Sequence, residues 1–146
     1  MTDTHELTIT RIFEAPRELV FRAWIDPDQL TRWYAPRGVH TPRETIEVDP
    51  RPGGRWRLTM VNDTDGAEYP TGGVFHEVVE PERLVFTWGD PARDPDSETL
   101  VTITFTERGY KTEMIFHQTG LTDEHQRIGV HEGWSQALDK LAEALA

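Results

Sequence analysis

The sequence predicts an α+β fold in which a curved antiparallel sheet wraps around one long C-terminal helix, with two short helices after the first strand. Three observations predict it. Residues 43–119 contain successive segments with apolar side chains at every second position, which is typical of strands with one buried face. Residues 122–146 repeat apolar side chains at three- and four-residue steps, as an amphipathic helix does. Residues 16–34 contain the start signals of two short helices.

The first strand is expected over residues 5–14, where apolar side chains alternate with threonines. Pro16 suits the first turn of a helix, because a proline there gives up only an N–H that would be unpaired anyway. This helix is expected to run to about Trp24, which we expect to pack between helices. Its apolar stripe consists of Leu19, Val20, Ala23 and Trp24.

The dipeptide Asp26-Pro27 indicates where the second short helix begins. An aspartate side chain at the N-cap accepts a hydrogen bond from a free backbone N–H, and proline is favoured at the first helical position. The apolar face of this helix consists of Leu30, Trp33 and Tyr34.

Six further strands are expected, separated by turns that include PRPGG (50–54) and an acidic loop, DPARDPDSE (90–98). The PRPGG segment does not precede a helix, so it is interpreted as a hairpin turn and not as a phosphate-binding loop. The strands cover residues 43–49, 54–62, 69–79, 83–89, 98–107 and 110–118.

The C-terminal helix is expected to begin after Thr122 as its N-cap. Gly129 and Gly133 lie within it, and a glycine in a helix costs about 1 kcal/mol relative to alanine. Close packing of the helix on the sheet is the explanation that we favour for both, and room for a ligand is the alternative. The inward stripe consists of Ile128, His131, Trp134, Leu138, Leu141 and Leu145.

Length and composition limit the classes of function. The 146 residues are expected to form one domain, residues 1–146, and the net charge of −11 disfavours nucleic acid and anionic membranes as partners. Cysteine is absent and the histidines lack the spacing of metal ligands, so neither a metal nor another cofactor is expected. No signal peptide and no membrane-spanning segment is recognisable, which favours a cytoplasmic protein.

Five stretches of the sequence carry a resemblance to a known family. The chain resembles the START-like (SRPBCC) superfamily of helix-grip proteins, and within it the group related to the C-terminal domain of the activator of the ninety-kilodalton heat-shock protein's ATPase. The resemblance implies a helix-grip fold with an internal hydrophobic cavity and no single activity. The stretches are IFEAPRELVFRAWIDPDQLTRWYAP, DPRPGGRWRLTM, GGVFHEVVEPERLVFTW, TLVTITF with GYKTEMIFHQTGL, and HEGWSQALDKLAEAL.

In such a fold the second short helix closes the open mouth of the sheet, so Trp33 and Tyr34 are expected beside the cavity. For the strand residues, core and cavity wall are the same predicted surface. The alternation leaves open which face His76 points to, and His131 is expected to be partly buried. The predicted cavity residues are Trp33, Tyr34, Trp56, Met60, His76, Trp88, Phe105, Met114, Phe116, His131, Trp134 and Leu138.

The leading functional hypothesis is that the cavity binds a small apolar molecule without catalysis. One alternative is a cyclase or dehydratase acting on a polyketide-like substrate, in which His76, His131 or Tyr34 would move a proton. The other is a co-chaperone or interaction module that works through its surface. The sequence does not decide the oligomeric state and leaves a homodimer open.

Overall fold

The computed structural model describes residues 5–90 and 99–145. All but the first residue of the predicted acidic loop 90–98 lies outside the described residues. The elements in chain order are β1 (His5–Phe13), α1 (Arg17–Arg22), α2 (Pro27–Trp33), β2 (Val39–His40), the 3₁₀ turn η1 (Arg43–Thr45), β3 (Glu47–Val48), β4 (Arg55–Asn62), β5 (Glu68–Val79), β6 (Arg83–Trp88), β7 (Thr99–Arg108), β8 (Lys111–Leu121) and α3 (Glu124–Leu145).

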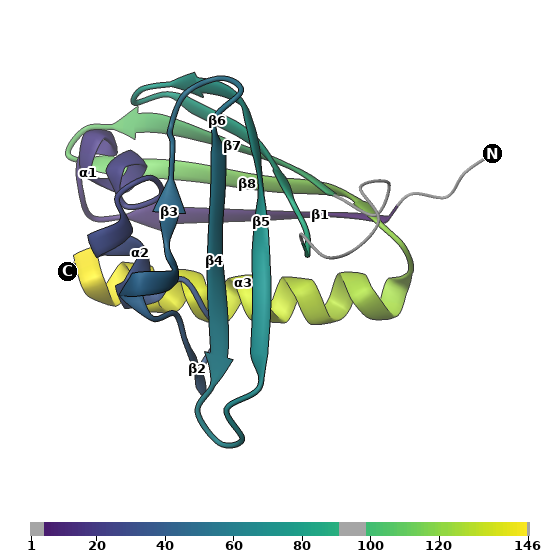
Figure 1. The fold of residues 1–146 in the computed structure, drawn as a ribbon. Coiled ribbons are helices and arrows are strands. Elements are labelled where there is room, and N and C mark those ends of the chain that lie inside the picture. The colour runs from purple at the N-terminus through teal and green to yellow at the C-terminus, as the bar shows by residue number, and fades with distance from the viewer. Residues whose placement is uncertain (1–4, 91–98, 146) are drawn as a thin grey trace.

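The sheet is antiparallel and strongly curved, and it wraps around α3 as predicted. Its strand order is β1-β8-β7-β6-β5-β4-β2, with β3 paired to β4. Figure 1 shows that β4 and β5 cross the direction of β1, β7 and β8, while α3 runs alongside β1. The first and last strands are neighbours, so the curved sheet presents one continuous apolar face to the helix. This is the α+β helix-grip arrangement.

The curvature requires a close approach of backbones at the middle of β5. A Cβ atom added to Gly73 would lie 1.9 Å from the carbonyl oxygen of Thr87 on β6. Gly72 pairs with Arg57 of β4 and also bridges to Gly89, which follows β6. Only glycine allows three backbones to meet so closely, because it has no Cβ.

The two short helices form where the sequence predicts them. The side chain of Asp26 accepts a hydrogen bond from the backbone N–H of Asp28 at 2.9 Å, and Pro27 occupies the first position of α2. In α1 the buried residues are Val20 and Phe21, whereas Leu19 is exposed, so its predicted place in the apolar stripe is wrong. Helix α1 is only six residues long, and it packs against strands β7 and β8.

Two predicted boundaries are wrong. Residues 43–49 are not one strand, because a 3₁₀ turn follows Pro42 and only Glu47–Val48 pair with β4. The side chain that caps α3 is Asp123, which accepts a hydrogen bond from the backbone N–H of Gln126, and not Thr122. The predicted hairpin turn is confirmed, because residues 49–54 connect the antiparallel strands β3 and β4.

Candidate functional site

A pocket opens between the middle of α3 and the sheet; we call it the outer pocket. It contains about 470 Å³ of empty space, part of which opens to solvent. The floor is formed by strand residues, one wall by the helix and the rim by the segment that follows α2. The lining residues are Tyr34, Ala35, Pro36, Met60, Trp88, Val130, Gly133, Trp134 and Ala137. Apart from the hydroxyl of Tyr34 and two indole N–H groups, these side chains are apolar.

The rim of the outer pocket is tied to α3 by polar contacts outside the apolar lining. The Lys140 ammonium donates a hydrogen bond to the carbonyl oxygen of Ala35 at 3.1 Å. The backbone N–H of Arg37 donates to the side chain of Gln136 at 3.0 Å, and its guanidinium pairs with Glu143 at 3.1 Å. Partial burial, followed by the nearby charge of Arg37, lowers the pKa of Lys140.

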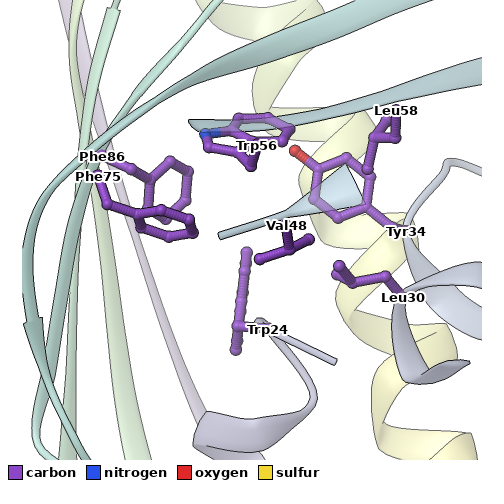
Figure 2. A pocket seen from close by; sticks show the side chains of 8 residues that line it. All are labelled: Trp24, Leu30, Tyr34, Val48, Trp56, Leu58, Phe75 and Phe86. Atoms are coloured by element: carbon purple, nitrogen blue, oxygen red, sulfur yellow. The ribbon is translucent and has the colours of Figure 1, made fainter. Parts of the chain in front are cut away.

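Tyr34 separates this space from a second one, which we call the inner pocket. The inner pocket lies deeper, between α2 and the strands, and contains about 290 Å³ of space between atoms. It is narrow, with room for about one water molecule as it stands. Its lining is entirely apolar or aromatic: Trp24, Leu30, Tyr34, Val48, Trp56, Leu58, Phe75 and Phe86. Figure 2 shows Phe75 and Phe86 on one side of this space and Tyr34 on the other.

One residue that lines the inner pocket, Trp24, has a buried donor without an acceptor among the described residues. The indole Nε1 of Trp24 is buried and has no hydrogen-bond partner among the described residues. The indole of Trp56, in contrast, donates to the carbonyl oxygen of Thr87 at 3.2 Å. Because a buried N–H without an acceptor is unfavourable, an acceptor that reached the indole of Trp24 would be stabilising.

Tyr34 is held in place from both sides. The indole Nε1 of Trp88 donates a hydrogen bond to its hydroxyl at 3.1 Å. Its ring lies 5.3 Å from that of Trp134 and 6.1 Å from that of Trp56, edge to face in both cases. Burial raises the pKa of the Tyr34 phenol far above its ordinary value of 10.0, and the bond from Trp88 opposes this shift only in part. The phenol therefore keeps its proton at neutral pH.

A buried chain of hydrogen bonds orients the wall of the outer pocket. The indole of Trp134 donates to the side-chain oxygen of Gln118 at 3.0 Å. The amide of Gln118 donates to the hydroxyl of Thr99, which donates to the carbonyl oxygen of Trp88, both at 2.8 Å. Sequence reasoning missed Gln118 and Thr99, because polar residues on alternating strands are usually assigned to the exposed face.

Five of the predicted cavity residues line the two pockets. Tyr34 lines both, Trp56 lines the inner pocket, and Met60, Trp88 and Trp134 line the outer pocket. Trp24, expected only to pack, contacts the ring of Trp33 and also lines the inner pocket. Six of the eight inner lining residues were not in the predicted set, and two of these, Val48 and Phe75, lie on segments whose facing the alternation did not define.

Five other predicted residues are core residues that line neither pocket. Trp33, expected at the mouth, is completely buried, and its indole donates to the carbonyl oxygen of Ala23 at 3.0 Å, so it joins the two short helices. Its predicted position beside the cavity is wrong. The remaining four are packed in the hydrophobic core: Phe105, Met114, Phe116 and Leu138.

The predicted histidines do not lie in the pockets. His76 is exposed because a β-bulge lies between Phe75 and Glu77, and the inward alternation resumes at Val78. The prediction that His76 lines the cavity is therefore wrong. His131 is half-buried, as expected, but it lines neither pocket. Of the three candidate proton carriers in the cyclase hypothesis, only Tyr34 therefore lines a pocket.

The two helix glycines have open space at their side-chain positions. A Cβ atom added to Gly129 or Gly133 would meet nothing within 4 Å. The favoured explanation, close packing of helix on sheet, is therefore wrong for both. Gly133 borders the outer pocket, whereas Gly129 is exposed and lies one turn earlier. The absence of a side chain at Gly133 keeps space in the pocket free.

Within residues 5–90 and 99–145, no cluster of three or more His, Asp or Glu side chains is arranged to hold a metal ion. None of the described helices combines the length and the apolar character needed to cross a bilayer.

Comparison with known proteins identifies relatives over almost the whole chain. The model of the family described as Activator of Hsp90 ATPase homolog 1-like protein matches residues 14–146. A protein from Chromobacterium violaceum is 29% identical, with 96% of each chain covered and a TM-score of 0.87. The AHSA1 protein from Silicibacter pomeroyi is 30% identical, with 97% of each chain covered and a TM-score of 0.84. A protein from Mycobacterium smegmatis is 29% identical over 99% of this chain and 96% of its own, with a TM-score of 0.79. No curated protein matches the sequence.

Proposed function

Because this chain belongs to the Activator of Hsp90 ATPase homolog 1-like family of START-like proteins, whose fold commonly binds hydrophobic ligands, we propose that it binds a small apolar molecule in the outer pocket. The observation that carries the proposal is the apolar space between α3 and the sheet, kept free by Gly133. A ligand there would replace water on apolar side chains, which is the main source of affinity for such molecules.

The accessibility and chemistry of the outer pocket support this proposal. Part of its empty space opens to solvent, so a ligand can enter from the surface. Its walls are aromatic and aliphatic, and Met60 can adapt to the shape of a ligand because methionine is unbranched and flexible. The hydroxyl of Tyr34 and the indole of Trp88 are the polar groups available for orienting the ligand.

The test compares two substitutions on the same helix. Gly133→Leu places a side chain in the outer pocket, whereas Gly129→Leu places the same side chain one turn away in solvent. Both should fold, because leucine is a better helix former than glycine and neither position is crowded. Binding of the fluorescent apolar probe N-phenyl-1-naphthylamine should weaken at least tenfold in Gly133→Leu and remain unchanged in Gly129→Leu.

Equal affinity of the probe for the two leucine variants, both correctly folded by circular dichroism, would contradict the proposal. Native mass spectrometry of the freshly purified protein supplies an independent measurement, because a retained molecule would appear as added mass in the wild type and be lost in Gly133→Leu.

A second candidate function is suggested by the family's description, which names activation of a chaperone ATPase. Such a role would use the surface of the protein and would not require the outer pocket. Stimulation of Hsp90 ATPase activity by the wild type and by Gly133→Leu alike would favour this candidate over ligand binding.

A further inference from the structure

The two pockets share one lining residue, Tyr34, and it is the residue that separates them. Its ring stands between Trp134, a wall of the outer pocket, and Trp56, a wall of the inner pocket. Tyr34 is therefore the side chain common to both spaces, and the rings of Trp24, an inner wall, and Trp134, an outer wall, also lie 5.7 Å apart.

The backbone of Tyr34 is fixed by backbone and Thr41 contacts, whereas its ring is held by side chains alone. Its N–H donates to the carbonyl oxygen of Leu30 at 2.9 Å, and its own carbonyl accepts from the hydroxyl of Thr41. The hydroxyl of the ring has one hydrogen bond from a described residue, the bond from Trp88. Rotation of the side chain to another staggered position would break this bond and the ring contacts with Trp33, Trp56 and Trp134, but it would not move the end of α2.

We propose, building on the ligand-binding function above, that the outer and inner pockets are two parts of one elongated site, that rotation of Tyr34 joins them, and that the ligand is an elongated apolar molecule with a hydrogen-bond acceptor at its inner end. The inner pocket determines this chemistry. Its walls are apolar, so the inserted end must be aliphatic or aromatic. Trp24, one of the lining residues, has a buried indole N–H without a partner among the described residues, so a carbonyl or ether oxygen that reaches it gains a hydrogen bond.

The length of the ligand can be tested with methyl ketones that carry a phenyl group at the opposite end of the chain, from 4-phenylbutan-2-one to 9-phenylnonan-2-one, because their carbonyl lies at the end that would enter the inner pocket. Each methylene group that becomes buried should raise affinity about fourfold. In the wild type the increase should continue through the series, because longer chains enter the inner pocket. Val48→Phe fills the inner pocket and should stop the increase partway. Val79→Phe, which adds the same volume at an exposed strand position, should behave as the wild type.

Tyr34→Ala removes the ring shared by the two pockets and should raise the affinity for 9-phenylnonan-2-one more than that for 4-phenylbutan-2-one. The acceptor is tested by comparing 9-phenylnonan-2-one with nonylbenzene, in which a methylene replaces the carbonyl. Trp24→Phe should reduce the ratio of the two affinities at least fivefold. In the wild type the indole N–H resonance of Trp24, identified by its loss in Trp24→Phe, should lie further downfield with the ketone than with the hydrocarbon.

Identical dependence on chain length in wild type and Val48→Phe would overturn the joined site. An unchanged affinity ratio in Trp24→Phe, together with the same Trp24 resonance for ketone and hydrocarbon, would overturn the acceptor. Binding of N-phenyl-1-naphthylamine distinguishes these results from failure of the proposed function. If the probe binds and is excluded by Gly133→Leu, ligand binding in the outer pocket stands and only the extension into the inner pocket is wrong.

Discussion

Tyr34 combines a rigid backbone position with a buried phenol on the boundary of two apolar spaces. It ends α2, where the chain leaves the helix, so the Asp26-Pro27 signal that positions α2 also positions this ring. The phenol is protonated and accepts the indole hydrogen bond of Trp88. Tyr34 therefore contributes a hydrogen bond to the stability of the fold, and its position makes it a lining residue of both pockets.

Tyr34→Phe tests this state of the phenol. At pH 8 the variant should lose about 1 kcal/mol of unfolding free energy, because the indole of Trp88 loses its acceptor. Above pH 10 the unfolded wild type releases the phenol proton while the folded protein retains it, so the unfolded state binds fewer protons and wild-type stability falls as pH rises. This contribution of Tyr34 should lower the unfolding free energy of the wild type by about 1.4 kcal/mol per pH unit, and the variant should lack it.

Urea unfolding of both proteins between pH 8 and pH 11 measures this effect. Groups other than Tyr34 titrate in both proteins and cancel in the difference. The two stability curves should converge above pH 10, and parallel curves would show that the Tyr34 phenol ionises normally in the folded state.

Sequence reasoning identified Tyr34 but exchanged the roles of the two neighbouring tryptophans. Trp33 joins the two short helices, and Trp24 reaches the inner pocket. Helical periodicity identifies which residues are apolar and on one side, but a short helix packed on several neighbours buries more than one side. The particular neighbour of each ring depends on tertiary packing, which periodicity does not contain.

Among the elements, β5 determines how the sheet bends around the site. Its twelve residues pair with β4 at one end and with β6 at the other, and Gly72 and Gly73 lie where the three strands approach. At the same place the carbonyl oxygen of Thr87 accepts a hydrogen bond from the indole of Trp56. The bend therefore also orients a wall of the inner pocket.

Gly73→Ala should lower the unfolding free energy by about 1–3 kcal/mol or more. The Cβ of the alanine would overlap the carbonyl of Thr87 and displace β6. Gly133→Ala is the matched control, since the same methyl group would enter open space in a helix and should stabilise by about 1 kcal/mol. Urea unfolding measures both. An equal effect of the two substitutions would contradict the close approach in β5.

The long elements were predictable from the sequence and the irregular ones were not. Alternation located β4, β6, β7 and β8 to within about three residues, because apolar side chains recur at every second position in each. It did not reveal the β-bulge at His76, where one extra residue reverses the facing of everything after it, nor the 3₁₀ turn that replaces most of strand 43–49. Both exceptions change which residues reach the inner pocket.

At the scale of the whole molecule, the apolar face of the sheet is divided into a packed part and a part with free space. Leu138 of α3 belongs to the packed part, because it is fully buried and lines neither pocket. Trp134, one turn earlier on α3, lines the outer pocket. The same helix therefore supplies both core residues and lining residues of the outer pocket.

Leu138→Ala should lower the unfolding free energy by about 2–5 kcal/mol, because it leaves a cavity in the core. It should not change the affinity for N-phenyl-1-naphthylamine below the unfolding transition. Ile128→Ala removes an exposed side chain from the same helix and should change stability by less than about 0.5 kcal/mol. Loss of probe affinity in folded Leu138→Ala would show that the pocket extends further along α3 than the outer lining does.

The pairing of β1 with β8 also has a consequence for how the protein is made. His5–Phe13 leave the ribosome long before Lys111–Leu121, so the first strand has no partner through most of translation. The helix that covers the apolar face of the sheet is synthesised later still. Because these pairings join distant parts of the chain, they form slowly. The nascent sheet therefore exposes its apolar face until translation is nearly finished, and this interval is when the chain most needs protection from aggregation.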